Sequence, residues 1–324
     1  MTFPANQTSL VADIGGTNTR VALSTGGKVL HDTIRRFANA EYPDLVAVLT
    51  RFIADAGGVD CAGACVAAAG PVRDGVAEMT NLDWTIDHVS VATATRAETV
   101  AVLNDLQAQG HALGHLAPGA LRHVTGPAAG QKGASQLVIG VGTGFNAAPV
   151  HDGPGGRIVA ASECGHVTMP VRTEADLRLS QFVEKAHGFP GVEDALSGRG
   201  LERVHAWASA EAGHGQTKTA AEIMALIEAG GDAIAERTGT VFVRLLGAVA
   251  GNLALTHLPF GGSYLIGGVA RAFTPHLGRF GFAEAFRDKG RFSEFMEQFP
   301  VFVIEDDYAA LQGCAAYLET LMAA

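Results

Sequence analysis

The stretch L-V-A-D-I-G-G-T-N-T-R, residues 10–20, decides how the chain begins to fold. Its apolar run, residues 10–14, stops at Gly15-Gly16. Paired glycines allow backbone angles and close approaches that a Cβ would forbid, so this pattern predicts a buried strand that leads into a tight turn.

The same turn has the composition of an anion-binding site. The glycines expose backbone N–H groups, Thr17 and Asn18 add short donors, and Asp13 ends the strand where it could hold Mg²⁺ through water. Neither the Gly-Lys-Ser/Thr of a Walker P-loop nor the G-x-G-x-x-G of a dinucleotide fold is present. The alternative interpretation is an ordinary hairpin with a buried Asp13.

Glycine turns follow apolar strands at two more places, after residues 137–141 and after residues 263–266. Glycines also occur wherever backbones pack tightly, so each turn alone is a weak signal. Three such turns in one chain favour a nucleotide site. The candidates are Gly142, Thr143 and Gly144 for a polyphosphate, and Gly267 and Gly268 for a base or ribose.

Strands and helices alternate through the first part of the chain, which predicts an α/β domain with a largely buried sheet. Expected strands there include 59–69 and 100–103. A helix is expected to begin with Pro43 at its first position, and its apolar residues follow over 45–53 at amphipathic spacing. Later helices are expected over 173–185, 197–207 with Ser197 as N-cap, 232–257 and 308–322, and a strand over 301–304.

Length and composition limit the class of protein. The 324 residues suggest about two domains at roughly 150 residues each. Hydrophobic residues make up 48% and charged residues 17%, which excludes disorder as the main state. A net charge of −10 argues against nucleic acid as a partner, because phosphate backbones need clustered Lys and Arg.

No targeting or membrane segment is expected. The first basic residue is Arg20, whereas a secretory signal needs a positive region before its apolar stretch. The longest apolar tract, 241–258, is interrupted by polar residues and predicts a buried helix. The four cysteines lack C-x-x-C spacing and are expected to be reduced, so we expect a cytoplasmic protein.

Asn104 and Asp105 fall at the carboxyl end of an expected strand, where open α/β sheets place their ligands. Asp105 could act as a general base that accepts a proton from a substrate hydroxyl, with Asn104 orienting a neighbouring hydroxyl. Alternatively, Asp105 only caps the helix that follows. The residues themselves leave both interpretations open.

Glu163, Cys164 and His166 lie within one short segment, and Glu193 follows downstream. Carboxylates, an imidazole and an amide suit a polyhydroxylated ligand, because each can bond to one or two sugar hydroxyls. Two alternatives remain: the three residues could bind a metal, or Cys164 and His166 could be a nucleophile and its base.

Taken in order, these motifs resemble the bacterial ATP-dependent glucokinases of the hexokinase and actin-like fold over nearly the whole length. The matching stretches are D-I-G-G-T-N-T-R from Asp13, M-T-N-L-D-W from Met79, L-N-D from Leu103, G-V-G-T-G from Gly140, E-C-G-H-V from Glu163, E-D-A-L-S-G-R-G-L from Glu193, G-N-L-A-L from Gly251, G-G-S-Y-L-I-G-G-V-A-R-A-F from Gly261 and F-R-D-K-G-R-F from Phe286.

The resemblance implies a two-domain actin-like ATPase (ribonuclease H-like) fold. A small α/β domain, 1–115 plus 306–324, and a larger α+β domain, 116–305, would enclose a cleft and close over the sugar. The resemblance also implies a homodimer that uses ATP with Mg²⁺, no nucleic acid or membrane partner, and no direct protein ligand to the metal. The implied roles are catalytic base for Asp105; sugar contacts for Asn104, Asp105, Glu163, His166 and Glu193; and nucleotide contacts for Asp13, Gly15, Gly16, Thr17, Asn18, Gly142, Thr143, Gly144, Gly267 and Gly268.

The chain departs from the family pattern at three positions. Cys164 and Asn146 stand where glycine is more common, and Arg199 replaces a proline. Cys164 lies between two implied sugar ligands, so the departures bear on sugar preference more than on reaction type. The cysteine-rich zinc motif of the ROK sugar kinases is missing, which disfavours that sister family.

The expected reaction is transfer of the γ-phosphoryl group of ATP to the 6-hydroxyl of D-glucose, the entry to glycolysis. The alternatives are a kinase for fructose, mannose or an amino sugar, an actin-like ATPase without a sugar substrate, and a sugar-sensing transcriptional regulator. The regulator would need a DNA-binding segment ahead of Asp13, and the 12 residues there are too few for a helix-turn-helix.

Overall fold

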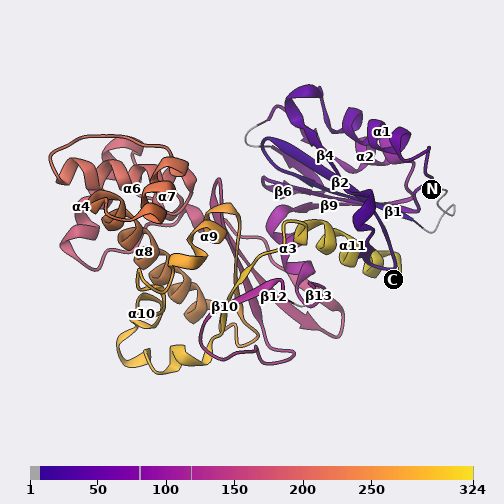
Figure 1. Ribbon diagram of the computed structural model, residues 1–324. Helices are drawn as coiled ribbons and strands as arrows, with labels where there is room; N and C mark the ends of the chain where they lie inside the picture. The colour runs from indigo at the N-terminus through magenta and orange to yellow at the C-terminus, as the bar shows by residue number, and fades with distance from the viewer. Residues whose placement is uncertain (1–7, 80–81, 118, 324) are drawn as a thin grey trace. The chain divides into compact units, whose positions relative to one another are not determined.

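The computed structural model describes residues 8–79, 82–117 and 119–323 (Figure 1). Thr80 and Asn81 of the M-T-N-L-D-W motif lie outside these residues. The chain divides into two compact units. Unit 1 comprises Met1–Pro118, Gly153–Ala161 and Asp306–Ala324, and unit 2 comprises Gly119–Asp152 and Ser162–Glu305.

Unit 1 is built on a sheet with the strand order β3-β2-β1-β5-β9, and β4 pairs with β2. β1, β5 and β9 are parallel, whereas β2 is antiparallel to β1. The described strands of this unit are β1 Ser9–Ile14, β2 Asn18–Thr25, β3 Lys28–Val29, β4 Arg35–Ala38, β5 Gly63–Ala68, β9 Thr99–Asn104 and β13 Gly156–Val159, with β6 Val72–Arg73, β7 Val76–Glu78 and β8 Thr85–Ile86 in a small separate sheet.

Both faces of this sheet are covered by helices, because its strands are apolar on both sides. Leu10 on β1 packs into a core with Leu49 and Val91, whereas the next residue, Val11, packs into another core with Ala108 and Leu318. In Figure 1 the C-terminal helix α11, in yellow, accordingly lies beside α3. The helices are α1 Leu45–Asp55 and α2 His88–Thr95 on one face, and α3 Asp105–Ala112 and α11 Ala309–Met322 on the other.

The register of unit 1 brings the first glycine turn and the Asn104-Asp105 pair to the same edge of the sheet. Ile14 pairs with Ala68, and Ala68 pairs with Asn104. Neighbouring strands lie about 4.8 Å apart, so the ends of β1 and β9 are about 10 Å apart. This edge carries the candidate residues of unit 1.

Unit 2 has its own sheet, in which strands follow the order β10-β15-β14-β11-β12. β11 and β14 are parallel and in register from Leu137 with Ser263 to Gly140 with Ile266, so their two glycine turns leave the sheet side by side. The strands are β10 Leu121–Thr125, β11 Gln136–Val141, β12 Phe145–Gly153, β14 Ser263–Ile266 and β15 Val301–Ile304; the helices are α4 Glu174–His187, α5 Val192–Ala195, α6 Gly198–Glu211, α7 Ala220–Ala229, α8 Ala233–His257, α9 Gly268–Phe273 and α10 Phe282–Arg287.

Helix α8 is long and apolar enough to span a membrane by composition, but two thirds of its apolar window is buried within the protein. Phe242, Leu246 and Ala250 are wholly buried and belong to the core of unit 2. The helix packs against α10 and α6. The tract predicted as a buried helix is therefore the central core helix of this unit.

Helix boundaries confirm some of the sequence predictions and correct others. Ser197 is the N-cap of α6, as predicted, because its hydroxyl accepts from the Gly200 backbone N–H at 2.9 Å. Pro43 is not the first helical residue, because Asp44 caps α1 and the helix begins one residue later. The cap of α3 is Asn104, and Asp105 is the first residue of that helix.

Candidate active site

The first glycine turn is held from inside by Asn39, a residue that the sequence analysis missed. Its Nδ2 donates to the carbonyl of Gly15 at 2.7 Å, its Oδ1 accepts from the Thr19 hydroxyl at 2.8 Å, and its backbone N–H donates to the carbonyl of Thr17 at 2.9 Å. Asn39 is 2% exposed. Its three bonds fix the turn from the buried side, whereas Thr17 itself is exposed.

Asp13 lies beside this turn but is already paired. Its Oδ2 accepts from the guanidinium of Arg20 at 3.0 Å, and Arg20 is its cross-strand partner on β2. Burial raises the pKa of the Asp13 carboxyl, and the positive charge of Arg20 opposes that rise. One bond to an arginine leaves lone pairs on both carboxylate oxygens, so Asp13 could still accept from a water that is bound to a metal.

Asn104 and Asp105 mark the junction of β9 and α3. The Oδ1 of Asn104 accepts from the backbone N–H of Leu106 at 3.0 Å, and its Nδ2 donates to the carbonyl of Gly70 at 2.9 Å. Because an amide nitrogen carries two hydrogens, one N–H of Asn104 remains for a ligand hydroxyl. Asp105 Oδ1 accepts from the same Leu106 N–H at 2.8 Å, so its carboxylate lies at the positive end of the helix.

The glycine turns of unit 2 need glycine for steric reasons. Gly267 has a φ of +106°, and a Cβ there would collide with the carbonyl of Val141. A Cβ on Gly144 would come within 2.5 Å of Glu193 Oε2. Gly268, by contrast, has no atom within 4 Å of where its Cβ would be, so its backbone faces open space. Thr143 and Gly268 are the exposed members of this group, and the other three glycines are half-buried.

Glu193 links the second glycine turn to helix α5. Its Oε2 accepts from the backbone N–H of Phe145 at 2.9 Å, directly after Gly144. Gly142 is fixed in turn by the backbone N–H of Gly198, which donates to its carbonyl at 2.8 Å. The structure thus brings Glu193 to the polyphosphate candidates, a contact that the sequence analysis did not predict.

Glu163 and His166 lie together on the surface of unit 2. The side chains are 59% and 70% exposed, and Glu163 Oε2 is 4.0 Å from His166 Nε2. Within the described ranges, no group of three or more His, Cys, Asp or Glu side chains could hold a metal ion. Burial raises the pKa of the Cys164 thiol, which opposes the nucleophile alternative.

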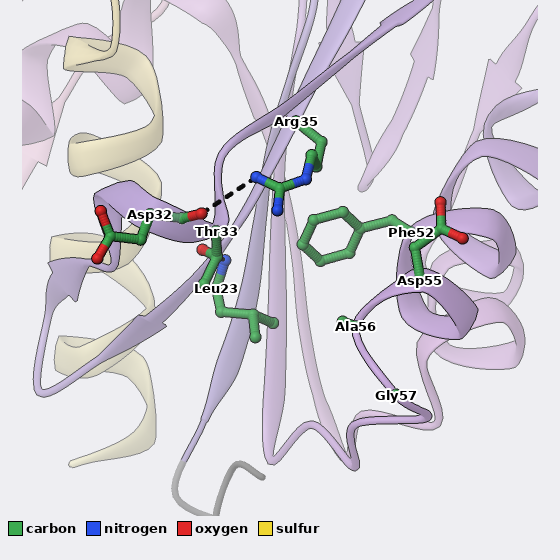
Figure 2. Close-up of a pocket in the computed structure, with 8 residues that line it drawn as sticks. All are labelled: Leu23, Asp32, Thr33, Arg35, Phe52, Asp55, Ala56 and Gly57. Carbon is green, nitrogen blue, oxygen red and sulfur yellow. Dashed lines mark hydrogen bonds between the residues drawn. The ribbon is translucent and has the colours of Figure 1, made fainter. Parts of the chain in front are cut away.

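A pocket of about 380 Å³ in unit 1 is separate from the first glycine turn (Figure 2). Leu23 and Phe52 line it, and Arg35 Nη1 donates to the carbonyl of Asp32 at 3.1 Å beside it. Leu23 lies four residues beyond Thr19 along β2, which is about 13 Å at roughly 3.3 Å per residue. This pocket is therefore distinct from the edge that carries the glycine turn.

Solved structures with the same fold include sugar kinases and a ROK family transcriptional regulator, the latter with a TM-score of 0.68 at 19% identity. A glucokinase from an Antarctic psychrotroph has a TM-score of 0.86 and 29% identity, covering 96% of this chain and 98% of its own. A ROK family glucokinase from Streptomyces griseus, solved with glucose and AMPPNP, has a TM-score of 0.66 at 20% identity, covering 95% and 99%. The predicted actin-like ATPase fold is confirmed, and the likeness to the 29% identical glucokinase places the chain among the hexose kinases.

The family follows from the sequence comparison. The Glucokinase family model matches residues 10–321, and the chain belongs to that family. A glucokinase from Chromobacterium violaceum is 33% identical over 310 residues, covering 95% of this chain and 88% of the relative. A glucokinase from Saccharophagus degradans is 32% identical over 316 residues, covering 96% and 98%. The family predicted from the motifs is confirmed.

Proposed function

We propose that this hexose kinase transfers the γ-phosphoryl group of ATP to the 6-hydroxyl of D-glucose, with Asp105 as the catalytic base. The proposal is based on the sheet of unit 1, in which Ile14, Ala68 and Asn104 are aligned on neighbouring strands. Asp105 and the first glycine turn therefore follow strands that end at the same edge of the sheet. A phosphate-binding turn and a carboxylate about two strands apart suit a donor phosphate and an acceptor hydroxyl.

The proposed residues would either position the reactants or stabilise the charge of the transition state. The transition state of phosphoryl transfer is loose, so little covalent chemistry is required of the protein. The N–H groups of Gly15 and Gly142 already donate to the carbonyls of Asn18 and Gly144, at 3.0 and 2.9 Å, so other backbone N–H groups of these two turns would bind the phosphates. Gly267 with Gly268 would face the adenosine. Asp105 would take the proton late from the sugar hydroxyl, which Asn104 would orient through its remaining N–H.

Glu163 and His166 would complete the sugar contacts from unit 2, and Glu193 would join them. The bond from the Phe145 N–H to Oε2 leaves Glu193 the rest of its carboxylate for a hydroxyl. Magnesium would arrive with ATP and neutralise phosphate charge, with Asp13 fitting a contact through water.

A coupled assay over a panel of hexoses and phosphoryl donors tests the reaction. We expect glucose with ATP and Mg²⁺ to give the highest kcat/KM, and a higher value with fructose, mannose or an amino sugar would overturn the choice of substrate. Asp105→Asn keeps the shape of the side chain and removes the base, so kcat should fall at least about 100-fold with little change in ATP binding. A parent-like kcat would refute the role of Asp105.

We further propose a cytoplasmic homodimer that acts at the entry to glycolysis. The support is the family itself together with the buried, reduced state of Cys61, Cys65 and Cys314. Light scattering of the purified protein at micromolar concentration checks the dimer, and a monomer mass would contradict it.

A further inference from the structure

The side-chain amide of Asn146 joins strand β12 to the segment that carries Glu163. Its Oδ1 accepts from the backbone N–H of Ala147 at 2.8 Å and of Cys164 at 3.1 Å, and from the Ser162 hydroxyl at 3.3 Å. Its Nδ2 donates to the carbonyl of Ser162 and to Glu163 Oε2, the latter at 3.4 Å. One amide thus contacts each residue from 162 to 164.

The orientation of this amide follows from the chemistry of its partners. The backbone N–H groups of Ala147 and Cys164 can only donate, so the atom that faces them is the oxygen. The nitrogen therefore faces a carbonyl and a carboxylate, which can only accept. Every neighbour of Asn146 agrees with one orientation, and in that orientation an N–H is aimed at Glu163.

Cys164 completes the arrangement. Its Sγ lies 3.6 Å from Asn146 Oδ1, and the residue is half-buried. Burial raises the pKa of this thiol, so it keeps its proton at neutral pH and can donate weakly to the amide oxygen. Asn146 and Cys164 are also two of the three departures from the family pattern, and they are in direct contact.

We propose that Asn146, supported by Cys164, is a positioning residue that orients the Glu163 carboxylate toward a hydroxyl of the hexose and so sets sugar preference. The inference rests on the proposed function, in which Glu163 contacts the sugar. Glu163 is 59% exposed, and a long exposed side chain loses rotamer freedom when it binds. A donor that already holds the carboxylate reduces that loss and raises the affinity for the matching hydroxyl.

The decisive variant is Asn146→Asp, because it keeps the acceptor oxygen of the amide and removes the donor nitrogen. Asp keeps an oxygen for the N–H groups of Ala147 and Cys164, but it loses the donor to the Ser162 carbonyl, so the melting temperature is measured beside the kinetics. The substitution also replaces the donor that faces Glu163 by a negative oxygen, and like charges repel. We expect the glucose KM of Asn146→Asp to rise about tenfold or more and that of Asn146→Ala about fivefold, with ATP KM within about twofold in both.

Matched controls separate positioning from a loss of structure. Asn252 is exposed on α8, so Asn252→Asp makes the same chemical change away from this loop and should leave both KM values and the melting temperature unchanged. Cys164→Ser keeps a donor to the amide oxygen, because a hydroxyl replaces the thiol, and the glucose KM should stay near that of the parent. Cys164→Ala removes this donor and should raise the glucose KM by about twofold.

Calorimetric titration with glucose and with its singly deoxygenated analogues closes the test. If Asn146 acts through Glu163, one of these analogues lacks the hydroxyl that donates to the Glu163 carboxylate. For that analogue, the Kd of Asn146→Asp should equal the Kd of the parent protein. Equal loss for all analogues, an unchanged glucose Kd, or equal rises in the glucose and ATP constants would overturn the inference. Failure of the unsubstituted protein to bind glucose would instead refute the proposed function.

Discussion

Replacing Asn39 by alanine tests whether a buried amide shapes the first glycine turn. The substitution removes the donor to the Gly15 carbonyl and the acceptor of the Thr19 hydroxyl, and it keeps the backbone bond to Thr17. Thr19 is 0% exposed, so its hydroxyl cannot turn to bulk water. The variant therefore leaves polar groups unsatisfied inside unit 1.

The size of the effect follows from these two bonds. A buried polar group that loses its partner costs about 1–3 kcal/mol, so two groups should cost about 2–6 kcal/mol of unfolding free energy. For a unit of this size, each kcal/mol lowers Tm by about 3 °C, which gives a decrease of about 6–18 °C. The turn also loses its internal brace, so the KM for ATP should rise several-fold while the glucose KM changes less.

Thermal unfolding followed by circular dichroism, with ATP kinetics at a temperature where both proteins are folded, measures both effects. The matched control is Asn252→Ala, which removes an exposed amide on α8 and should change unfolding by less than about 0.5 kcal/mol. If Asn39→Ala melted within about 1 °C of the parent and kept its ATP KM, the amide would not hold the turn.

Three further predictions follow from individual contacts. Gly267→Ala should destabilise unit 2 by about 2 kcal/mol or more, because φ is +106° and the added Cβ would meet the Val141 carbonyl. Gly268→Ala should leave Tm unchanged and raise only the ATP KM, because its Cβ would face open space. Equal Tm values for the two variants would contradict this prediction. A backbone hydrogen bond from Ser90 lowers the pKa of the Asp87 carboxyl at the N-cap of α2, so the cap stabilises the fold above the carboxyl's ordinary pKa and loses this effect as pH falls through the lowered value. Asp87→Ala should thus cost about 1 kcal/mol at pH 7 and progressively less as the pH falls through the acid range, as urea unfolding over a series of pH values would show. Iodoacetamide should modify Cys164 first, because the other three cysteines are buried and the pKa of Cys61 is raised to about 11; mass spectrometry that found Cys61 or Cys314 labelled first would refute this.

The parts of the fold that sequence predicted well are those encoded by neighbouring residues. Strand 301–304 and the strand before Gly267 appear where the apolar runs and glycines indicated. Ser197 caps its helix because its own hydroxyl reaches an N–H three residues ahead. Such signals depend on a few consecutive residues, so one sequence is enough to read them.

The residues that position the candidate site could not be found in this way. Asn39 lies 24 residues from the carbonyl it holds, and Glu193 lies 48 residues from the N–H it accepts. No spacing or composition distinguishes either contact, because only the packing of the chain brings the groups together. Pro43 was misplaced for a local reason, since the side chain of Asp44 competes for the helix start and accepts from Ala47 N–H.

Both glycine elements with polyphosphate candidates share one physical solution. Glycine loses more conformational freedom on folding than any other residue, and each turn has a backbone bond of its own, from Gly15 N–H to the Asn18 carbonyl and from Gly142 N–H to the Gly144 carbonyl. Further bonds from outside the turn reduce the freedom that remains. In unit 1 the buried amide of Asn39 supplies these bonds, and in unit 2 the carboxylate of Glu193 and the N–H of Gly198 do so. N–H groups that are fixed before the ligand binds need not be reordered during the reaction. Such preorganised groups stabilise the charge of the transition state more strongly than mobile ones. Substitutions at these bracing residues should therefore change nucleotide kinetics even though the side chains of Asn39 and Glu193 bond to the turns from within the protein.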